Sequence, residues 1–455
     1  MNGTTGAIVQ ESAAVAPAFD AVDAPSLDLM SACVHCGFCL PTCPTYRLWG
    51  EEMDSPRGRI YLMKEAAEGR TPMSSTFVGH FDTCLGCMAC VTACPSGVQY
   101  GPLIERTRAQ IERRYERPLR ERLLRRALFS VLPYPARLRA LFAPLLIVGP
   151  AVRAVGASRV AQRLPAFLRS IMALAPRITW AGVADGLPAE ARAAGTRRLT
   201  VGLLAGCVQR VAFPHVHAAT VRVLAAEGCD VRVPHGQGCC GALALHAGRL
   251  DEGRAFARRL IAAFEHAEVD RIVVNAAGCG SAMREYGDLL ADDPDWAARA
   301  RAFSARVRDI SELLVELGEP RARRHPIHAR VTYHDACHLA HAQGIRSAPR
   351  DLLRAIPGIE LVTPADAEIC CGSAGIYNLV QPEPAAALGA EKAARLAETK
   401  PDIVATANPG CTLQIAAAAR RRGEQWPVVH PIEIVDASIR GESVINVVAG
   451  LQPAR

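Results

Sequence analysis

Residues 33–44 read CVHCGFCLPTCP, and residues 84–95 read CLGCMACVTACP. Each stretch places three cysteines at two-residue gaps, then a fourth cysteine after three more residues, and then proline. This spacing is typical of a chain that wraps three thiolates around one [4Fe-4S] cluster while the fourth thiolate reaches a second cluster. The two stretches therefore predict a pair of [4Fe-4S] clusters in this part of the chain.

The spacing also predicts which cysteine binds which cluster. The first three cysteines of each stretch are expected on one cluster, and the fourth on the other. Gly37 and Gly86 suit a close approach of the backbone to cluster sulfide, and we expect His35 to be an exposed loop residue. Tetrahedral zinc is the alternative, but zinc rarely needs this three-plus-one spacing followed by proline. The predicted ligands are Cys33, Cys36, Cys39 and Cys94 for cluster 1, and Cys84, Cys87, Cys90 and Cys43 for cluster 2.

The whole chain has 455 residues and 17 cysteines. This length predicts two to four domains, and the odd number of cysteines argues against a simple disulfide framework. No segment reaches the roughly 18 uninterrupted apolar residues of a membrane span, and the first residues lack the basic patch and apolar run of a signal peptide. We therefore expect a chain in the reducing cytoplasm, where cysteines bind metals or carry out redox reactions.

An internal repeat of cysteines follows from residue 196 onward. Cys207 is followed after 31 residues by Cys239-Cys240-Gly241, and after 37 more residues by Cys279. The second copy repeats this order with gaps of 32 and 38 residues. Repeated spacing of this kind indicates repeated structure. The second copy consists of Cys337, Cys370, Cys371, Gly372 and Cys411.

Each copy also alternates apolar strands with helices. Strands are predicted at residues 199–204 and 272–275 in the first copy, and at 331–334 and 403–407 in the second. Such alternation predicts a parallel sheet, and open sheets of this kind bind ligands at the carboxyl ends of their strands. We therefore expect the four thiols of each copy to converge on one site. Cys229 has no counterpart in the second copy and is predicted to be a buried free cysteine.

The Cys-Cys-Gly repeats allow three kinds of site: a further iron–sulfur centre, zinc or another structural ion, or a redox-active thiol site. His334 and His338 flank Cys337, and we expect them to donate hydrogen bonds near the ligands or to face a bound small molecule. A Cys-His nucleophile pair is disfavoured because Val208 follows Cys207 in the first copy. The candidate metal ligands in the repeats are Cys207, Cys239, Cys240, Cys279, Cys337, Cys370, Cys371 and Cys411.

A basic segment without cysteines joins the two cysteine-rich regions. Residues 104–180 contain sixteen Arg and four Glu, a net charge of +12, and several prolines interrupt them. The segment predicts short basic amphipathic helices, which either lie on an anionic membrane surface or form a solvated face packed on the other domains. We expect no nucleic-acid partner, because no nucleic-acid module accompanies the charge.

These features predict a multidomain chain of the α+β and α/β classes. A helical, ferredoxin-like module with two [4Fe-4S] clusters precedes two repeated α/β domains with parallel sheets. The predicted parts are a flexible tail at 1–28, the two-cluster module at 29–103, the basic connector at 104–195, and the two repeats at 196–325 and 326–455.

The cysteine motifs, together with DSPRGRIYLMK at 54–64, YHDACHL at 333–339 and CCGSAG at 370–375, resemble a known family. The chain is similar to the iron–sulfur subunit of glycolate oxidase (glycolate dehydrogenase), within the group that joins a ferredoxin-like module to two CCG domains. One departure concerns the fullest CCG motif of the group, which ends in Cys-x-x-Cys and binds a noncubane cluster through five cysteines. Here Ala282 and Gln414 stand at those positions, which puts such a cluster in question.

The resemblance implies an oxidoreductase subunit without its own catalytic flavin. Flavoprotein partner subunits, carrying FAD, would oxidise glycolate to glyoxylate, and this chain would pass the electrons towards a membrane quinone or another acceptor. It would then lie in the cytoplasm or on the inner face of the cell membrane. The alternatives are a subunit of a related D-lactate or glycerol-3-phosphate dehydrogenase, or a thiol/disulfide enzyme similar to heterodisulfide reductase.

Overall fold

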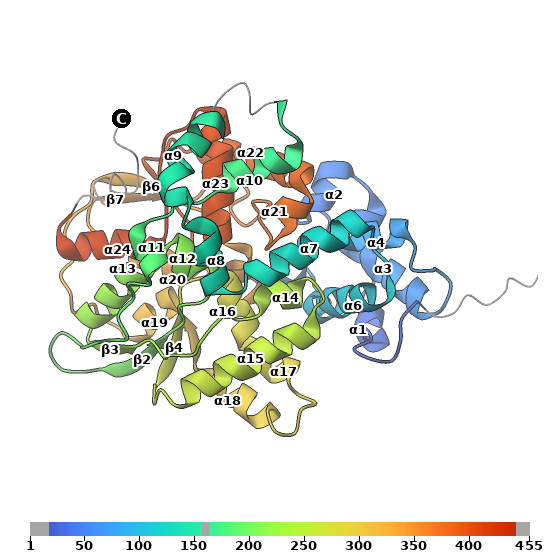
Figure 1. Ribbon diagram of the computed structural model, residues 1–455, viewed down its shortest axis with the longest axis horizontal. Coiled ribbons are helices and arrows are strands. Elements are labelled where there is room, and N and C mark those ends of the chain that lie inside the picture. Colours follow the sequence, from blue (N-terminus) through green and yellow to red (C-terminus); the bar gives the residue numbers. More distant parts are fainter. Residues whose placement is uncertain (1–17, 157–162, 443–455) are drawn as a thin grey trace, which may run out of the picture.

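The computed structural model describes residues 18–156 and 163–442. Figure 1 shows the N-terminal module (blue) at one end of the molecule and the two repeats side by side at the other. The fold class is confirmed: a helical N-terminal module precedes two α/β repeats, each built on its own sheet.

The N-terminal module is built from short helices around an apolar core. The rings of Phe77 and Phe81 pack with centroids 4.7 Å apart and planes inclined by 45°, and Met63 and Leu103 are fully buried beside them. Such close aromatic and aliphatic packing gives the loops that carry the cysteines a rigid support. The elements are α1 (Leu27–Ser31), α2 (Pro44–Trp49), η1 (Glu52–Asp54), α3 (Pro56–Ala67), α4 (Ser75–Asp82), α5 (Ala89–Thr92) and α6 (Tyr100–Arg114).

Part of the predicted flexible tail is packed on this module. Ala18 and Phe19 are buried in its core, and the backbone N–H of Asp20 donates to the Gln110 side chain of α6 at 2.9 Å. The prediction of a flexible tail is therefore wrong for residues 18–28, because an apolar pair anchors them. Residues 1–17 lie outside the described residues. Helix α6 also runs across the predicted domain boundary at 103/104.

The connector forms short helices, as predicted. Proline residues mark the starts of three of them: Pro118 precedes α7, Pro135 is the first residue of α8, and Pro165 precedes α10. Pro150 is the exception, since it lies inside α9. The helices are α7 (Leu119–Val131), α8 (Pro135–Phe142), α9 (Leu145–Gly156), α10 (Ala166–Leu174) and α11 (Trp180–Ala184). Within the described ranges, a helix pair bent by 58°, Pro135–Phe142 with Leu145–Val152, has the length and composition of a membrane span, but no single helix does.

The first repeat is a five-stranded sheet in the order β1-β3-β2-β4-β5. Its strands are parallel except β1, which pairs antiparallel with β3. The predicted strands at 199–204 and 272–275 are confirmed to within a residue at each end. The strands are β1 (Glu190–Ala191), β2 (Leu199–Leu203), β3 (Cys229–Arg232), β4 (Arg271–Val274) and β5 (Val307–Asp309). The helices are α12 (Val208–Ala212), α13 (Pro214–Ala226), α14 (Ala242–His246), α15 (Leu250–Glu265), α16 (Ala277–Arg284), α17 (Tyr286–Leu289), α18 (Ala297–Arg306) and α19 (Ile310–Glu316).

The second repeat has four parallel strands in the order β7-β6-β8-β9. The strands are β6 (Ala329–Tyr333), β7 (Ile359–Val362), β8 (Ile403–Ala405) and β9 (Val428–Val429). The helices are η3, a π-helical turn (His338–Ala342), α20 (Ser347–Arg354), α21 (Tyr377–Val380), α22 (Pro382–Glu398), α23 (Pro409–Arg422) and α24 (Pro431–Arg440). The order β-α-β-α-β of the first repeat recurs, which agrees with the repeat seen in the sequence.

The two repeats share one apolar core. Val201 of the first sheet and Val331 of the second belong to the same buried cluster. Helix α24 of the second repeat packs on α13 of the first, and α19 of the first packs on α20 of the second. Arg222 of α13 also pairs with the buried carboxylate of Asp436 in α24 at 2.6 Å. Each repeat therefore covers apolar surface that the other would expose.

Candidate iron–sulfur and thiol sites

The cysteines predicted for cluster 1 come together in one pocket. Cys33, Cys36 and Cys39 line it from one loop, and Cys94 lines it from the second stretch. The pocket lies at the molecular surface, since the Cys36 side chain is exposed and the other three are partly exposed. Four thiols around one hollow are the donor set of a [4Fe-4S] cluster, so the residues present fit this group.

The cysteines predicted for cluster 2 line a second pocket. Cys84, Cys87 and Cys90 line it from their loop, and Cys43 lines it from the first stretch. This pocket is more enclosed, because Cys43, Cys84 and Cys87 are buried. Each stretch thus contributes its fourth cysteine to the pocket of the other stretch, as the three-plus-one spacing predicts.

The two cysteine loops share an unusual backbone conformation. The third residue of each motif, His35 or Gly86, and the fifth, Gly37 or Met88, all have positive φ angles of 53–89°. Alternation of right- and left-handed residues turns successive backbone N–H groups towards one side and forms a concave anion-binding surface. Glycine is therefore favoured at 37 and 86 by backbone conformation. His35 is exposed in this loop, as predicted.

The SPRGR sequence at 55–59 supports cluster 1 from α3. Ser55 caps the helix by accepting a hydrogen bond from the Gly58 N–H at 3.0 Å. A side chain at Gly58 would lie 1.9 Å from the carbonyl oxygen of Glu52, so only glycine fits. Arg57 donates to the carbonyl of His35 at 2.9 Å and pairs with Glu52. The segment therefore ties the cluster 1 loop to a rigid helix.

Arg59 is a candidate functional residue that the sequence patterns did not predict. Its side chain is 1% exposed and lines the cluster 2 pocket. The guanidinium donates to the His80 carbonyl at 2.5 Å, to Asp54 Oδ1 at 3.1 Å and to Thr83 Oγ1 at 3.1 Å. A fixed positive charge at this position stabilises negative charge in the pocket. Its place in the SPRGR segment, between the two cysteine stretches, was the signal that could have found it.

Electrostatics distinguish Cys84 from the other thiols of this pocket. Burial disfavours its thiolate, but the guanidinium groups of Arg59 and Arg108 outweigh burial, so the pKa of Cys84 lies below that of an ordinary thiol. For Cys87 and Cys90, burial comes first among the causes and raises the pKa. The cationic side of the pocket therefore lies next to Cys84, and bound iron would be needed to keep Cys87 and Cys90 ionised.

The four thiols of the first repeat converge at the carboxyl edge of its sheet, as expected. Cys207 follows β2 and lies 3.6 Å from Cys239, measured between sulfurs. Hydrogen bonds from Cys239 and Cys279 favour the thiolate of Cys240, and its pKa is well below the usual value. Gly241, after the cysteine pair, has φ +82°, which explains the glycine of the motif.

The second repeat brings its four thiols together in the same order. Cys337 contacts Cys370, which contacts Cys371, which in turn contacts Cys411. All four are buried. Gly372 has φ +87°, and a side chain there would lie 2.8 Å from the carbonyl of Ala385. The two repeats thus build the same thiol row on equivalent loops.

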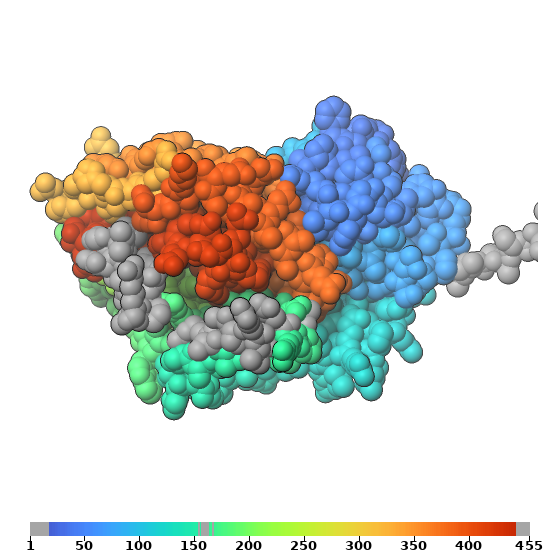
Figure 2. Space-filling view, turned by 90° about the horizontal axis from the view of Figure 1, so that it is seen from above, coloured from blue at the N-terminus to red at the C-terminus, as the bar shows by residue number. Residues whose placement is uncertain are grey.

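The cluster 2 pocket adjoins the thiols of the second repeat. Cys87 and Leu85 belong to one buried cluster with Cys337 and Cys370. The N-terminal module is held there by Arg47, which pairs with Asp366 at 2.9 Å and with Glu391 at 2.7 Å. Figure 2 shows the module (blue) in close contact with the second repeat (orange and red). No pattern in the sequence predicts this contact, because it joins segments about 250 to 344 residues apart.

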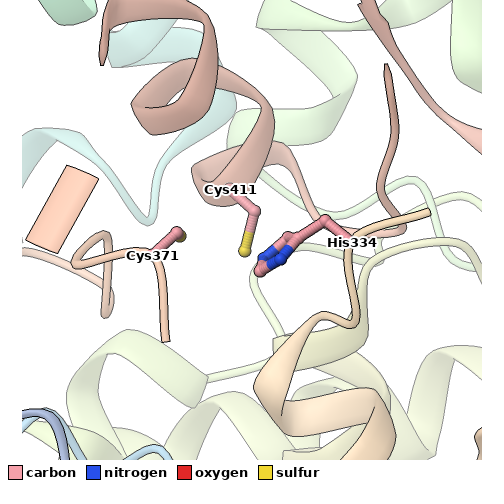
Figure 3. Close-up of side chains that lie close together, drawn as sticks. All are labelled: His334, Cys371 and Cys411. Carbon is pink, nitrogen blue, oxygen red and sulfur yellow. The ribbon is translucent and has the colours of Figure 1, made fainter. Parts of the chain in front are cut away.

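Two further predictions concern single residues. Cys229 is fully buried in β3 within the shared core, so the prediction of a buried free cysteine is confirmed. His334 lies close to Cys371 and Cys411, and Figure 3 shows Cys411 pointing at its imidazole ring. His338 instead stacks on His246 of the first repeat.

Comparisons with known proteins agree with this arrangement. A family model described as a 4Fe-4S dicluster domain matches residues 29–98, and a cysteine-rich domain model matches residues 201–284 and 331–416. The chain is 39% identical to the probable glycolate oxidase iron-sulfur subunit of Bacillus subtilis, over 86% of this chain and 89% of the relative. It is 37% identical to the glycolate oxidase iron-sulfur subunit of Escherichia coli, over 91% and 95%. Lactate utilization protein A of Oceanobacillus iheyensis is 31% identical, but over only 53% of this chain.

A two-cluster module joined to two cysteine-rich repeats defines an iron–sulfur protein of the electron-transfer class, with two [4Fe-4S] clusters. The chain belongs to the family of glycolate oxidase iron–sulfur subunits. The resemblance predicted from the motifs is thereby confirmed.

Proposed function

We propose that this chain is the iron–sulfur subunit of a flavin-dependent glycolate dehydrogenase, and that it carries electrons from a flavoprotein partner that holds FAD. The observation that carries the proposal is the similarity to two glycolate oxidase iron-sulfur subunits over most of the chain. The clusters, when bound, supply one-electron redox chemistry. A D-lactate dehydrogenase subunit is the alternative, and the partial match to a lactate utilization protein supports it less.

We assign the cluster ligands by the two pockets. Cluster 1 is held by Cys33, Cys36, Cys39 and Cys94, and cluster 2 by Cys43, Cys84, Cys87 and Cys90. The grouping of side chains around each pocket supports this assignment. In the repeats, a further iron–sulfur centre or zinc remains the proposed occupant, because four thiols meet in each copy.

We place the flavoprotein partner at the surface around cluster 1. Val34 and Phe38 of the cysteine loop are each 67% exposed, and Tyr61 beside them is 47% exposed. Exposed apolar side chains gathered around a functional group are typical of a protein interface. The cluster 2 pocket lies on the inner side, against the second repeat, so the two pockets and the repeat follow one another from the surface inward.

We further propose that the connector binds the inner face of the cell membrane, whose surface is anionic. A membrane quinone would accept the electrons there. Ile147 is 85% exposed, and Leu141 and Val148 are 56% and 46% exposed on the same helix pair. The surrounding segment carries a net charge of +12. Exposed apolar side chains within a basic segment favour binding to an anionic lipid surface.

The proposed function is tested by anaerobic reduction of the natively purified complex. Glycolate, D-lactate and glycerol 3-phosphate are added in turn, and cluster bleaching and the electron paramagnetic resonance signal are followed. We expect rapid reduction by glycolate in a complex that contains flavin. Reduction by D-lactate alone would favour the alternative, and reduction by dithionite alone, with none of the three substrates effective, would overturn the proposal.

A further inference from the structure

A tyrosine hydroxyl faces a ligand of cluster 2. Tyr100, the first residue of α6, is 3% exposed and lines the cluster 2 pocket. Its hydroxyl oxygen lies 3.6 Å from the sulfur of Cys84. A cysteine that binds iron is a thiolate and has no proton to give, so the hydroxyl must be the donor. The Gly86 N–H donates to the same sulfur at 3.4 Å, and Cys84 therefore accepts two hydrogen bonds.

Thr45 supplies the other hydroxyl group that lines this pocket. Its oxygen lies 3.2 Å from the sulfur of Cys43, but its proton goes to the carbonyl of Asp54 at 2.7 Å. Among the side chains that line the cluster 2 pocket, Tyr100 is therefore the one whose hydroxyl is free to donate to a ligand sulfur.

Arg108, on the same helix as Tyr100, brings a positive charge to this side of the pocket. Its guanidinium is held by three main-chain carbonyls, those of Phe81, Cys84 and His246. Within residues 18–156 and 163–442 it forms no salt bridge with a carboxylate. Arg59, in contrast, is compensated in part by Asp54. The charge of Arg108 therefore stays available to stabilise negative charge beside Cys84.

The cluster 1 pocket has neither of these features. Cys33 and Cys39 receive hydrogen bonds from the backbone, and no side chain in the described part of the protein donates to their sulfurs. Arg57 lines this pocket, but its guanidinium pairs with Glu52 at 2.6 Å, and both side chains are partly exposed. Solvent and salt screen exposed charges strongly. Added negative charge is therefore stabilised less at cluster 1 than at cluster 2.

Burial and these donors act on the reduction of cluster 2 in opposite directions. Reduction adds one negative charge to a cluster that four thiolates already surround, and enclosure disfavours that charge. A hydrogen bond to a ligand sulfur and a nearby cation favour it. Because the Tyr100 hydroxyl and the Arg108 guanidinium act inside the enclosed site, water screens them little. We therefore expect the two groups to outweigh burial.

We propose that cluster 2 has the higher midpoint potential of the two clusters, and that the Tyr100 hydroxyl and the Arg108 guanidinium raise it. An electron that enters at the exposed cluster 1 then passes inward: cluster 1 returns to its oxidised state, and cluster 2 is reduced by one electron. No bond is made or broken and no proton moves in this step. The module thereby stores one electron next to the second repeat and leaves cluster 1 free to accept the next.

This inference rests on the proposed assignment of ligands to the two pockets, but it requires neither glycolate nor a flavoprotein. Chemical reduction of the chain tests it, whereas reduction by substrate tests the proposed function. The two can therefore fail independently.

The test is a redox titration of the full chain, purified without oxygen, with dithionite and mediator dyes. Electron paramagnetic resonance follows each cluster. We expect two separate one-electron steps, and Cys90→Ala, which removes a ligand of cluster 2, should abolish the step at the higher potential. Reduction of both clusters at one potential, or loss of the lower step in Cys90→Ala, would overturn the proposed order.

Tyr100→Phe removes the hydroxyl and keeps the buried ring. The ratio of reduced to oxidised cluster 2 at a fixed potential should fall by about three- to tenfold, which corresponds to about 28–59 mV. In deuterated water, electron–nuclear double resonance should detect an exchangeable deuteron at reduced cluster 2 that this variant lacks. Tyr115→Phe is the matched control, because Tyr115 follows α6 and packs on the same core but lines neither pocket. An unchanged potential in Tyr100→Phe, or an equal shift in Tyr115→Phe, would overturn the role of the hydroxyl.

Arg108→Gln removes the charge and should also lower the potential of cluster 2, while cluster 1 keeps its own. Arg106→Gln removes the same charge from an exposed position of α6, where Arg106 donates to the Ala24 carbonyl at 3.4 Å, and it should leave both potentials unchanged. Equal shifts in the two variants would contradict a local effect of Arg108. If Arg108→Gln fails to fold, the order of the two steps in the unsubstituted chain and the Tyr100→Phe shift still decide.

Discussion

The imidazole rings of His246 and His338 stack with their centroids 4.7 Å apart and their planes inclined by 3°. His246 belongs to the first repeat and His338 to the second, and His246 also pairs with Glu105 of α6 at 2.8 Å. Arg108 of the same helix donates to the His246 carbonyl at 2.7 Å. Three parts of the chain therefore meet at this stack, which holds the cluster module and both thiol rows in one arrangement.

We predict that the two repeats do not fold separately. A chain ending at residue 325 would expose the part of the shared core that α20 and α24 cover, and it should be aggregated or unfolded by circular dichroism. Co-expression of residues 1–325 with 326–455 should restore a soluble complex, because the second fragment returns that surface. A folded, monomeric first fragment would show that the shared core is dispensable.

The crossed assignment of the fourth cysteines predicts opposite effects for two substitutions. Cys43→Ala should damage cluster 2 and spare cluster 1, although Cys43 lies in the first stretch, and Cys94→Ala should do the reverse. Each variant should lose up to about four of about eight iron atoms. The damaged cluster is identified by electron paramagnetic resonance against Cys90→Ala and Cys36→Ala, which remove ligands within the respective loops. If Cys43→Ala resembled Cys36→Ala, the assignment would be wrong.

Arg59→Leu should lower both the stability of the N-terminal module and the midpoint potential of cluster 2. It removes a buried cation and leaves the Asp54 carboxylate without its guanidinium partner, and breaking a buried pair costs roughly 3 kcal/mol or more. The midpoint potential of cluster 2 should fall, since the reduced, more negative state loses a nearby positive charge. Redox titration with electron paramagnetic resonance measures this shift.

Arg59→Lys is the control for charge. The ammonium keeps the positive charge but not the planar set of hydrogen bonds. We expect the potential to recover in this variant more than the thermal stability. A potential unchanged in Arg59→Leu would contradict the electrostatic role and leave Arg59 a purely structural residue.

Asp309→Asn should stabilise the protein in a pH-dependent way. Burial raises the pKa of Asp309 from 3.8 to about 6, so the folded state holds this proton more tightly than the unfolded chain. The stability from this group is fully present below pH 3.8 and is lost as the pH rises through 6. Asparagine cannot ionise and can still cap α19, where Asp309 accepts from the Ser311 N–H at 2.8 Å.

The expected gain in unfolding free energy therefore grows between about pH 4 and pH 6, and it levels off above about pH 6 at up to about 3 kcal/mol. Thermal unfolding of both proteins across this range measures it. A gain that did not change with pH would point to better packing instead of the lost charge. Ser304→Ala, on the neighbouring helix α18, serves as a control whose effect should not depend on pH.

The membrane contact predicts that Ile147→Glu weakens binding to vesicles containing phosphatidylglycerol by at least tenfold, about 1.4 kcal/mol. Ile147 is 85% exposed, so the change should not alter folding. Val315→Glu is the matched control, because Val315 is 47% exposed on α19, outside the connector. Binding should also fall with added salt. Equal binding of the two variants and the unsubstituted chain would exclude this surface.

Much of the candidate site was predictable because cluster ligation depends on short gaps along one chain. The gaps around Cys36 and Cys87 dictate loops that can surround iron, and the two copies of Cys-Cys-Gly dictate repeated loops at sheet edges. The packing of residues 18–28 was not predictable, because it depends on the contact of Phe19 with a core made by distant helices.

The sequence by itself determined how the cysteines group into sites, since local spacing sets which thiols can share one loop. Tertiary structure decided how those sites face one another. Cys87 lies against Cys337, and His334 against Cys411, only because separate segments pack together. Burial of apolar surface brings these segments into contact. No short sequence motif specifies which apolar segments pack together. It is this packing that places an enclosed cluster pocket between an exposed one and the second thiol row.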